Sequence, residues 1–274
     1  MNIPLSLIPL LLCAPSAAPA AAPAPSPLVA RSAHLQDEEG AKPDARPEVK
    51  ELVTELGEHL KKKGKEDELA LQVLDKVTQE FEKSGPKDRL AIVAAAAATF
   101  DEKRPKELSE GVPDTRIYDA AAVALGYMGP ESVQPLIALI DHKNLKKLLA
   151  TRGNVIRSLG KTKHLDGVKP LRELLQDKDV EIITAAAQAL GSYDGAPQDV
   201  RKDTFENLLK TLMSAKGAVD SDPQDMIARD RYQAIAASII TSLGALSGHD
   251  ERAPEDWQRW WNKNKKEDWD KKAG

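Results

Sequence analysis

Cysteine and histidine, which often act as nucleophile, general base or zinc ligand, are few in this sequence and far apart. The single cysteine is Cys13, and the five histidines are His34, His59, His142, His164 and His249. Nucleophilic catalysis needs a Ser, Cys or Thr beside a base, and a zinc site needs several converging ligands. The sequence has no motif with such spacing, so we expect surface histidines, no catalytic site, no metal and no other cofactor.

Two further segments have compositions that occur in ligand sites. The acidic run DSDPQD at residues 220–225 lacks the glycine and the distal glutamate of an EF-hand calcium loop. We therefore predict a solvated insertion loop there, with Asp225 near a helix start. Gly126 and Gly129 do not indicate a phosphate-binding loop, because they fall where one helix should end and a turn should begin.

The composition favours helices and argues against nucleic acid as a partner. Of the 274 residues, 41% are hydrophobic, 30% charged and 4% aromatic. The bias toward Ala, Leu, Lys, Glu and Asp favours helices over strands. The formal net charge is −4, with acidic and basic residues interspersed, so the chain lacks the basic patch that binds phosphate backbones.

The N-terminal residues are typical of an export signal. Residues 3–13, IPLSLIPLLLC, form an apolar stretch too short to span a membrane, followed by Ala- and Pro-rich sequence. We predict a signal peptide at residues 1–22, a secreted or periplasmic protein, and no integral membrane span. Lipid attachment at Cys13 is a less favoured alternative, because a leucine precedes it where a lipobox has a small residue. Residues 23–46 are predicted to form a disordered linker.

The rest of the chain consists of amphipathic segments in which two columns of similar residues recur. The sequence VQPLIALI at residues 133–140 is matched by VKPLRELL at residues 168–175, with the two prolines 35 residues apart. Proline is tolerated in a first helical turn, where its missing N–H has no partner to lose. Each proline therefore predicts a helix start.

The second column is a small residue followed by Leu-Gly, and it occurs four times. The leucines are Leu125, Leu159, Leu190 and Leu243, at intervals of 34, 31 and 53 residues. Apolar residues three and four positions before each leucine predict one buried stripe per helix. The longer last interval predicts an insertion at residues 214–229. We expect the next residue to end each helix in a left-handed cap, at Gly126, Gly160, Gly191 and Gly244.

These columns resemble the HEAT-repeat family, in which a first helix with a Pro-Leu motif precedes a turn with Asp and a second helix ending in Ala-Leu-Gly. The best copy is VKPLRELLQDKDVEIITAAAQALG at residues 168–191. The resemblance covers residues 86–246 and implies an all-α solenoid with a concave surface. A repeat domain at residues 47–274 would contain about five antiparallel hairpins, at residues 47–83, 86–128, 131–160, 165–192 and 199–246.

All four tryptophans lie in the C-terminal segment, residues 253–274. Trp257 precedes Trp260 and Trp261 by three and four positions, which places them on one side of a short helix. We predict that this helix caps the exposed core of the last repeat; binding of a partner by the aromatic patch is the alternative. A similar ending occurs in exported bacterial HEAT-like proteins, which this chain resembles.

The resemblance implies a protein-binding scaffold of the cell envelope or exterior rather than an enzyme. A partner protein or peptide segment would lie on the concave face, against polar side chains that point away from the packed stripe. The candidate contact residues are Arg116, Arg152, Arg157, Gln188, Arg229, Trp257, Trp260 and Trp261. Two alternatives are a HEAT-like lyase or chromophore-processing protein, and a structural envelope component that associates with itself through the tryptophan segment.

Overall fold

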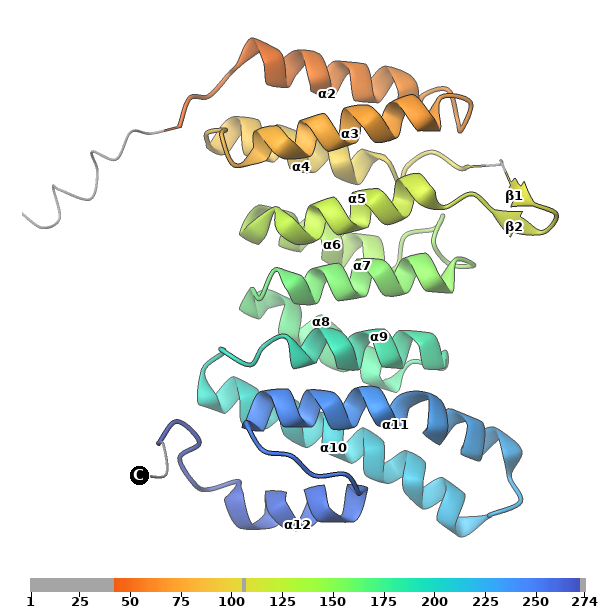
Figure 1. Ribbon diagram of the computed structural model, residues 1–274, viewed down its shortest axis with the longest axis vertical. Coiled ribbons are helices and arrows are strands. Elements are labelled where there is room, and N and C mark those ends of the chain that lie inside the picture. The colour runs from red at the N-terminus through yellow and green to blue at the C-terminus, as the bar shows by residue number, and fades with distance from the viewer. Residues whose placement is uncertain (1–41, 105–106, 272–274) are drawn as a thin grey trace, which may run out of the picture. The chain divides into compact units, whose positions relative to one another are not determined.

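The computed structural model describes residues 42–104 and 107–271. In this part of the chain the structure is helical apart from one two-stranded hairpin (Figure 1). The predicted signal peptide at residues 1–22, with Cys13, and residues 23–41 of the predicted linker lie outside the described residues. The α-helices are α2 (Pro47–Leu60), α3 (Asp67–Phe81), α4 (Pro86–Ala98), α5 (Arg116–Tyr127), α6 (Val133–Ile140), α7 (Leu149–Lys161), α8 (Val168–Glu173), α9 (Val180–Gly191), α10 (Gln198–Ser221), α11 (Met226–Ser247) and α12 (Pro254–Asn264).

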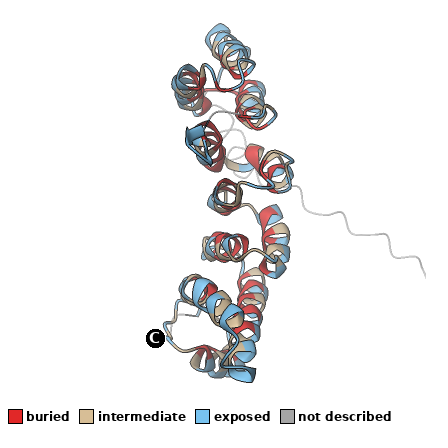
Figure 2. Ribbon diagram, turned by 90° about the vertical axis from the view of Figure 1, so that its right-hand side faces the viewer, coloured by how far each residue is buried: buried red, intermediate tan, exposed pale blue. Residues whose placement is uncertain are grey.

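The helices α2 to α11 form five consecutive hairpins, and each hairpin packs on the next. The first helices α2, α4, α6, α8 and α10 lie in one layer and the second helices α3, α5, α7, α9 and α11 in the other, which Figure 2 shows from the side. The 3₁₀ turns η1 (Gly129–Ser132) and η2 (Leu165–Gly167) lead into α6 and α8, and η3 (Leu174–Gln176) continues α8. The predicted all-α solenoid is therefore confirmed.

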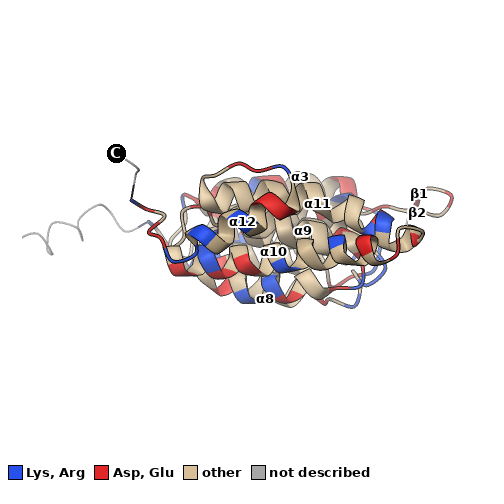
Figure 3. Cartoon of the chain, turned by 90° about the horizontal axis from the view of Figure 1, so that it is seen from below, with Lys and Arg blue, Asp and Glu red and all other residues tan. Residues whose placement is uncertain are grey.

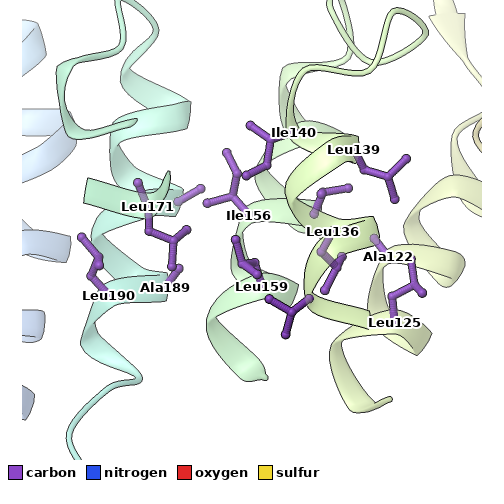
Figure 4. Packing of buried hydrophobic residues seen from close by; sticks show 14 of the residues in the cluster. Ala122, Leu125, Leu136, Leu139, Ile140, Ile156, Leu159, Leu171, Ala189 and Leu190 are labelled. Carbon is purple, nitrogen blue, oxygen red and sulfur yellow. The ribbon is translucent and has the colours of Figure 1, made fainter. Parts of the chain in front are cut away.

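The leucines of the Leu-Gly motif are buried between the two layers. Leu125, Leu159 and Leu190 have no accessible surface, and neither have Leu136 and Leu171 of the first helices (Figure 4). Burial of each such side chain contributes roughly 1.5–3 kcal/mol. The prolines that mark the first helices also lie as predicted, because Pro135 and Pro170 are in the first turns of α6 and α8. The Pro-Leu column thus lies in first helices and the Leu-Gly column in second helices, as predicted.

The prediction that the motif glycines are left-handed caps is wrong. Gly126, Gly160, Gly191 and Gly244 all lie within helices and have no positive φ. The left-handed residues follow three or four positions later, at Gly129 (φ 62°), Lys163 (φ 52°) and Gly248 (φ 67°). The helix therefore continues past Gly126, Gly160 and Gly244, and α9 ends at Gly191 without a left-handed residue. Three of these glycines have a packing role that is described below.

The predicted linker extends too far toward the first helix, because residues 43–46 are bound to the start of α4. The Asp44 carboxylate accepts hydrogen bonds from the backbone N–H groups of Lys87 (2.9 Å) and Asp88 (3.2 Å). In return the Asp88 carboxylate accepts from the N–H groups of Ala45 and Arg46, both at 3.0 Å. These reciprocal bonds satisfy donors that a helix start leaves free and fix the entry to α2.

Two insertions also differ from expectation. The surplus near residues 214–229 is not a long loop: it lengthens α10 and α11, and the turn between them is short. Asp225 caps α11 as expected, accepting from the N–H groups of Ile227 (2.9 Å) and Ala228 (3.0 Å). Between α4 and α5 the chain forms an unpredicted β-hairpin, β1 (Glu107–Ser109) and β2 (Val112–Pro113), with Gly111 in a left-handed conformation in its turn.

Candidate protein-binding face

The outer side of the second helices forms a regular surface along the array. We name it the second-helix face; it is formed by α3, α5, α7, α9 and α11, which lie in front of the first helices in Figure 1. Its regularity comes from the motif glycines. A Cβ atom added at Gly160 would lie 2.6 Å from the Cα of Ala189, which is far too close. The absence of a side chain therefore lets α7 and α9 pack backbone against backbone.

The same contact recurs along the face, and it joins one copy of the motif to the next. A Cβ at Gly126 would lie 3.0 Å from the Cβ of Ser158, and a Cβ at Gly191 would lie 3.0 Å from that of Ser242. Ser158, Ala189 and Ser242 are the small residues that open the following Leu-Gly motif. Each glycine thus receives the small residue of the next repeat, which holds α5, α7, α9 and α11 close together.

The contact is missing between α3 and α5, and a groove is present there. The sequence of α3, DELALQVLDKVTQEF, contains no glycine, and its packing against α5 is less extensive than that between later second helices. The groove has a volume of about 440 Å³. It is lined by Leu71, Leu74, Asp75 and Thr78 of α3 and by Asp119, Ala120, Val123, Ala124 and Tyr127 of α5.

Two apolar side chains on α5 are unusually exposed at this groove. Tyr127 is 68% and Val123 43% accessible, and the Lys161 ammonium lies 4.9 Å from the centre of the Tyr127 ring. The sequence analysis did not select either residue. The available signal was that Val123 and Tyr127 are four positions apart and outside the buried stripe of Ala121, Ala122 and Leu125, so they form an apolar pair on the opposite side of the helix.

Two smaller grooves follow along the face, each of about 350 Å³. The first lies between α7 and α9 and is bordered by Asn154, Arg157 and Glu181. The second lies between α9 and α11 and is lined mainly by small residues such as Ala237, Thr241 and Ala245. The polarity of the face therefore changes along the array.

Of the predicted contact residues, Arg157 and Gln188 lie together on this face. The Arg157 Nε donates to Gln188 Oε1 at 2.7 Å, and Gln188 Nε2 donates to Ser238 Oγ at 3.2 Å. Arg157 also donates to Asn154 (3.0 Å), whose side-chain amide donates to Asp119 (2.9 Å). A chain of hydrogen bonds therefore connects α5, α7, α9 and α11 across the surface.

Arg116 and Arg152 lie at the starts of second helices and are engaged in ion pairs. Arg116 pairs with Asp114 (2.8 Å) and Glu68 (2.6 Å), and its hydrogen bonds to these carboxylates raise its pKa above the ordinary arginine value. Arg152 donates to the backbone oxygen of Ile140 (2.8 Å) and pairs with Asp141 and Asp177. Arg152 thus links the third and fourth hairpins.

Arg229 lies near the start of α11, away from Arg157 and Gln188. It donates to the backbone oxygen of Pro223, and its Nη1 lies 3.8 Å from the sulfur of Met226. The neighbouring side chains of Met226 and Ile227 are 59% and 82% accessible. The structure therefore does not gather the five predicted polar residues into one site.

The tryptophans pack around Phe205 of α10 rather than projecting from the molecule. Trp257 is fully buried and Trp261 is 7% accessible. Four ring centres, those of Trp257, Trp260, Trp261 and Trp269, lie 5.1–5.7 Å from that of Phe205. Aromatic pairs at such distances stabilise beyond the area that they bury. This arrangement supports the prediction that α12 caps the last hairpin.

The four histidines that the structure describes lie at the surface, as predicted, and the structure does not bring them together. All four are partly accessible, and His59 and His249 hydrogen bond to Glu66 (2.8 Å) and Glu251 (3.0 Å). Among the described residues, no group of three or more His, Cys, Asp or Glu is placed to hold a metal ion. None of the described helices combines the length and apolar character needed to cross a bilayer.

The stacked hairpins and their glycine contacts define a helical-repeat protein of the α-solenoid class. Residues 106–190 and 145–212 match the HEAT repeats family. The chain thus contains HEAT repeats over residues 106–212. No curated protein and no solved structure gives a significant match to it.

Proposed function

We propose that the protein is a non-catalytic scaffold that binds another protein or a peptide segment on its second-helix face. HEAT repeats commonly mediate protein interactions, and stacked repeats present one extended surface to a partner. The observation that carries the proposal is the row of grooves between the second helices, with Val123 and Tyr127 exposed beside the one between α3 and α5. Exposed apolar side chains within a hollowed surface are typical of protein-binding sites.

The proposal can be tested by photo-crosslinking in the cells that make the protein. Benzoylphenylalanine placed at Val123 or Gln188 should crosslink a partner, because both side chains are exposed on the second-helix face. The matched control is the same group at Lys169, an exposed position on α8 in the other layer. Equal crosslinking to the same protein from Lys169, or no crosslinked partner from Val123 and Gln188, would contradict the proposal.

We further propose that the scaffold acts outside the cytoplasm, in the periplasm, cell envelope or exterior. The support is the apolar stretch at residues 3–13 and the Ala- and Pro-rich sequence that follows it. N-terminal sequencing of the protein recovered from cells should begin after the predicted signal peptide. Retention of Met1 in a cytoplasmic fraction would show that this proposal is wrong, and a lipid on an N-terminal Cys13 would support the anchored alternative.

A further inference from the structure

We propose that the groove between α3 and α5 binds a cationic amphipathic helix of the partner. This inference rests on the proposed function and specifies one site on the second-helix face and the chemistry that it recognises. The floor of the groove is apolar, and its two walls carry one carboxylate each, Asp75 on α3 and Asp119 on α5.

The two carboxylates are available to a partner's cation. Asp75 accepts a hydrogen bond from the side-chain amide of Gln79 at 2.7 Å. Asp119 accepts from the hydroxyl of Thr115 (2.8 Å) and the amide of Asn154 (2.9 Å). All three partners are neutral, and no lysine or arginine of the described chain forms an ion pair with either carboxylate. Both charges are therefore left for a Lys or Arg side chain from outside.

The dimensions and the apolar lining suit a helix. The α3 residues that line the groove run from Leu71 to Thr78, which is about 10 Å along a helix axis, or roughly two turns. A partner helix would place apolar side chains at positions i, i+3 or i+4, and i+7 against Leu71, Val123 and Tyr127, as in helix-in-groove recognition. Lysine or arginine residues flanking that stripe would reach the two carboxylates.

The other two grooves lack this combination. The α9–α11 groove is lined by small and polar residues and has no charged side chain among them. The α7–α9 groove has one carboxylate, Glu181, and its lining also includes the guanidinium of Arg157, which would repel a partner's cation. The preference for a cationic apolar segment is therefore specific to the α3–α5 groove.

The probe for the test is a displayed library of random peptides of about 16 residues, long enough for roughly four helical turns. The full chain is panned against the library, and recovered peptides are synthesised and titrated with the chain by fluorescence anisotropy. The inference predicts recovered sequences with apolar residues at helical spacing and flanking Lys or Arg. Their affinity should fall as salt is raised, because surface ion pairs are screened.

Variants then locate the binding site. Val123→Glu should weaken binding at least about tenfold, because it places a charge in the apolar contact, and Asp75→Asn with Asp119→Asn should weaken it about fivefold. The matched controls are Ala237→Glu in the α9–α11 groove and Glu181→Gln in the α7–α9 groove, which should leave binding unchanged. All five substituted positions line a groove on this face, and circular dichroism verifies that each variant is folded.

The outcomes separate this inference from the function on which it rests. Recovered peptides without cationic residues, or peptides lost on Ala237→Glu but not on Val123→Glu, would overturn the inference and leave the scaffold proposal standing. A dimer of the chain that Val123→Glu dissociates would overturn it as well, since the groove would then hold a second copy. Absence of both recovered peptides and crosslinked partners would overturn inference and function together.

Discussion

Gly160 has a hydrogen atom at the position where every other residue has a Cβ atom. The nearest atoms to an added Cβ all belong to Ala189, and two of them are backbone atoms, the Cα at 2.6 Å and the carbonyl oxygen at 2.8 Å. Backbone atoms inside a packed helix cannot move aside as the end of a flexible side chain can. The spacing of α7 and α9 therefore depends on this glycine.

We predict that Gly160→Ala lowers the free energy of unfolding by about 1–3 kcal/mol, because overpacking forces the two helices apart. In an unobstructed helix the same substitution has the opposite sign, since alanine is the better helix former. Gly217 of α10 is the matched control, because a Cβ there meets no atom within 4 Å. Urea denaturation should show Gly217→Ala stabilised by up to about 1 kcal/mol. Stabilisation by both substitutions would disprove the packing role.

Tyr193 leads to a prediction at high pH. Its side chain is buried, its hydroxyl donates to the backbone oxygen of His164 at 3.0 Å, and burial raises its pKa to about 12. The unfolded chain ionises near the ordinary value of about 10, so the stability linked to Tyr193 is fully present below pH 10 and is lost as pH rises toward 12.

The measurement compares the wild type with Tyr193→Phe, which has no ionisable group at that position. We expect the free energy of unfolding of the wild type to fall more steeply between about pH 9 and about pH 12 than that of the variant. Lysines titrate in the same range in both proteins and cancel in the comparison. Parallel pH profiles would show that Tyr193 ionises as easily in the folded chain as in the unfolded one.

Residue patterns predicted the positions of the helices better than they predicted the roles of single side chains. The four Leu-Gly motifs were enough to place four of the five second helices, because apolar residues repeated at three or four positions are a local signal. From the sequence, a glycine after such a leucine is compatible with a helix cap and also with a close contact between helices. The structure shows the close contact, because each glycine packs against a small residue of the following repeat: Ser158, Ala189 or Ser242. Likewise, the sequence predicts that Arg152 is a free surface group, whereas in the structure it forms ion pairs with Asp141 and Asp177.

At the scale of elements, α12 closes the end of the array. Its tryptophans surround Phe205, and the buried Arg201 of α10 donates to the backbone oxygens of Ala196 (3.0 Å) and Leu246 (3.1 Å) and pairs with Asp270. The segment after α12 is thus also held against α10. The cap was predictable because open solenoid ends expose apolar surface, whereas the β-hairpin at residues 107–113 was not, since its strands are too short to show alternation.

We predict that Trp257→Ala lowers the free energy of unfolding by about 3–5 kcal/mol, because it leaves a cavity under the cap. Lys263→Ala, at an exposed position on the same helix, should change it by less than about 0.5 kcal/mol. Removal of residues 253–274 should reduce helicity without altering the oligomeric state in light scattering. A truncated chain that keeps its helicity but dissociates into smaller units would instead support self-association through the tryptophans.

At the scale of the whole described array, stability should vary from one hairpin to the next. Repeat arrays are stabilised mainly by contacts between neighbours, and these contacts are closest where a glycine meets a small residue. Helices α7 and α9 have such contacts on both sides, through Gly126, Gly160 and Gly191, whereas α3 has none.

We therefore predict that native-state hydrogen exchange, followed by mass spectrometry, shows α2 and α3 opening at a lower free energy than α7 and α9. Val123→Glu, on the exposed side of α5, should leave this order unchanged and serves as the control. Equal protection of α3 and α9 would mean that the glycine contacts do not set local stability.

The match between each glycine and the small residue of the following repeat also bears on how such a protein could lengthen. A duplicated unit inserted after α7 would present a small residue to Gly160 and its own glycine to Ala189, so both new junctions would be compatible without further mutation. A second copy of the α2–α3 hairpin would have neither the motif glycine nor the small residue that packs against it, because α3 has no Leu-Gly motif. The middle hairpins could therefore be duplicated in tandem and still pack closely, whereas a duplicate of the first hairpin could not form the glycine contact.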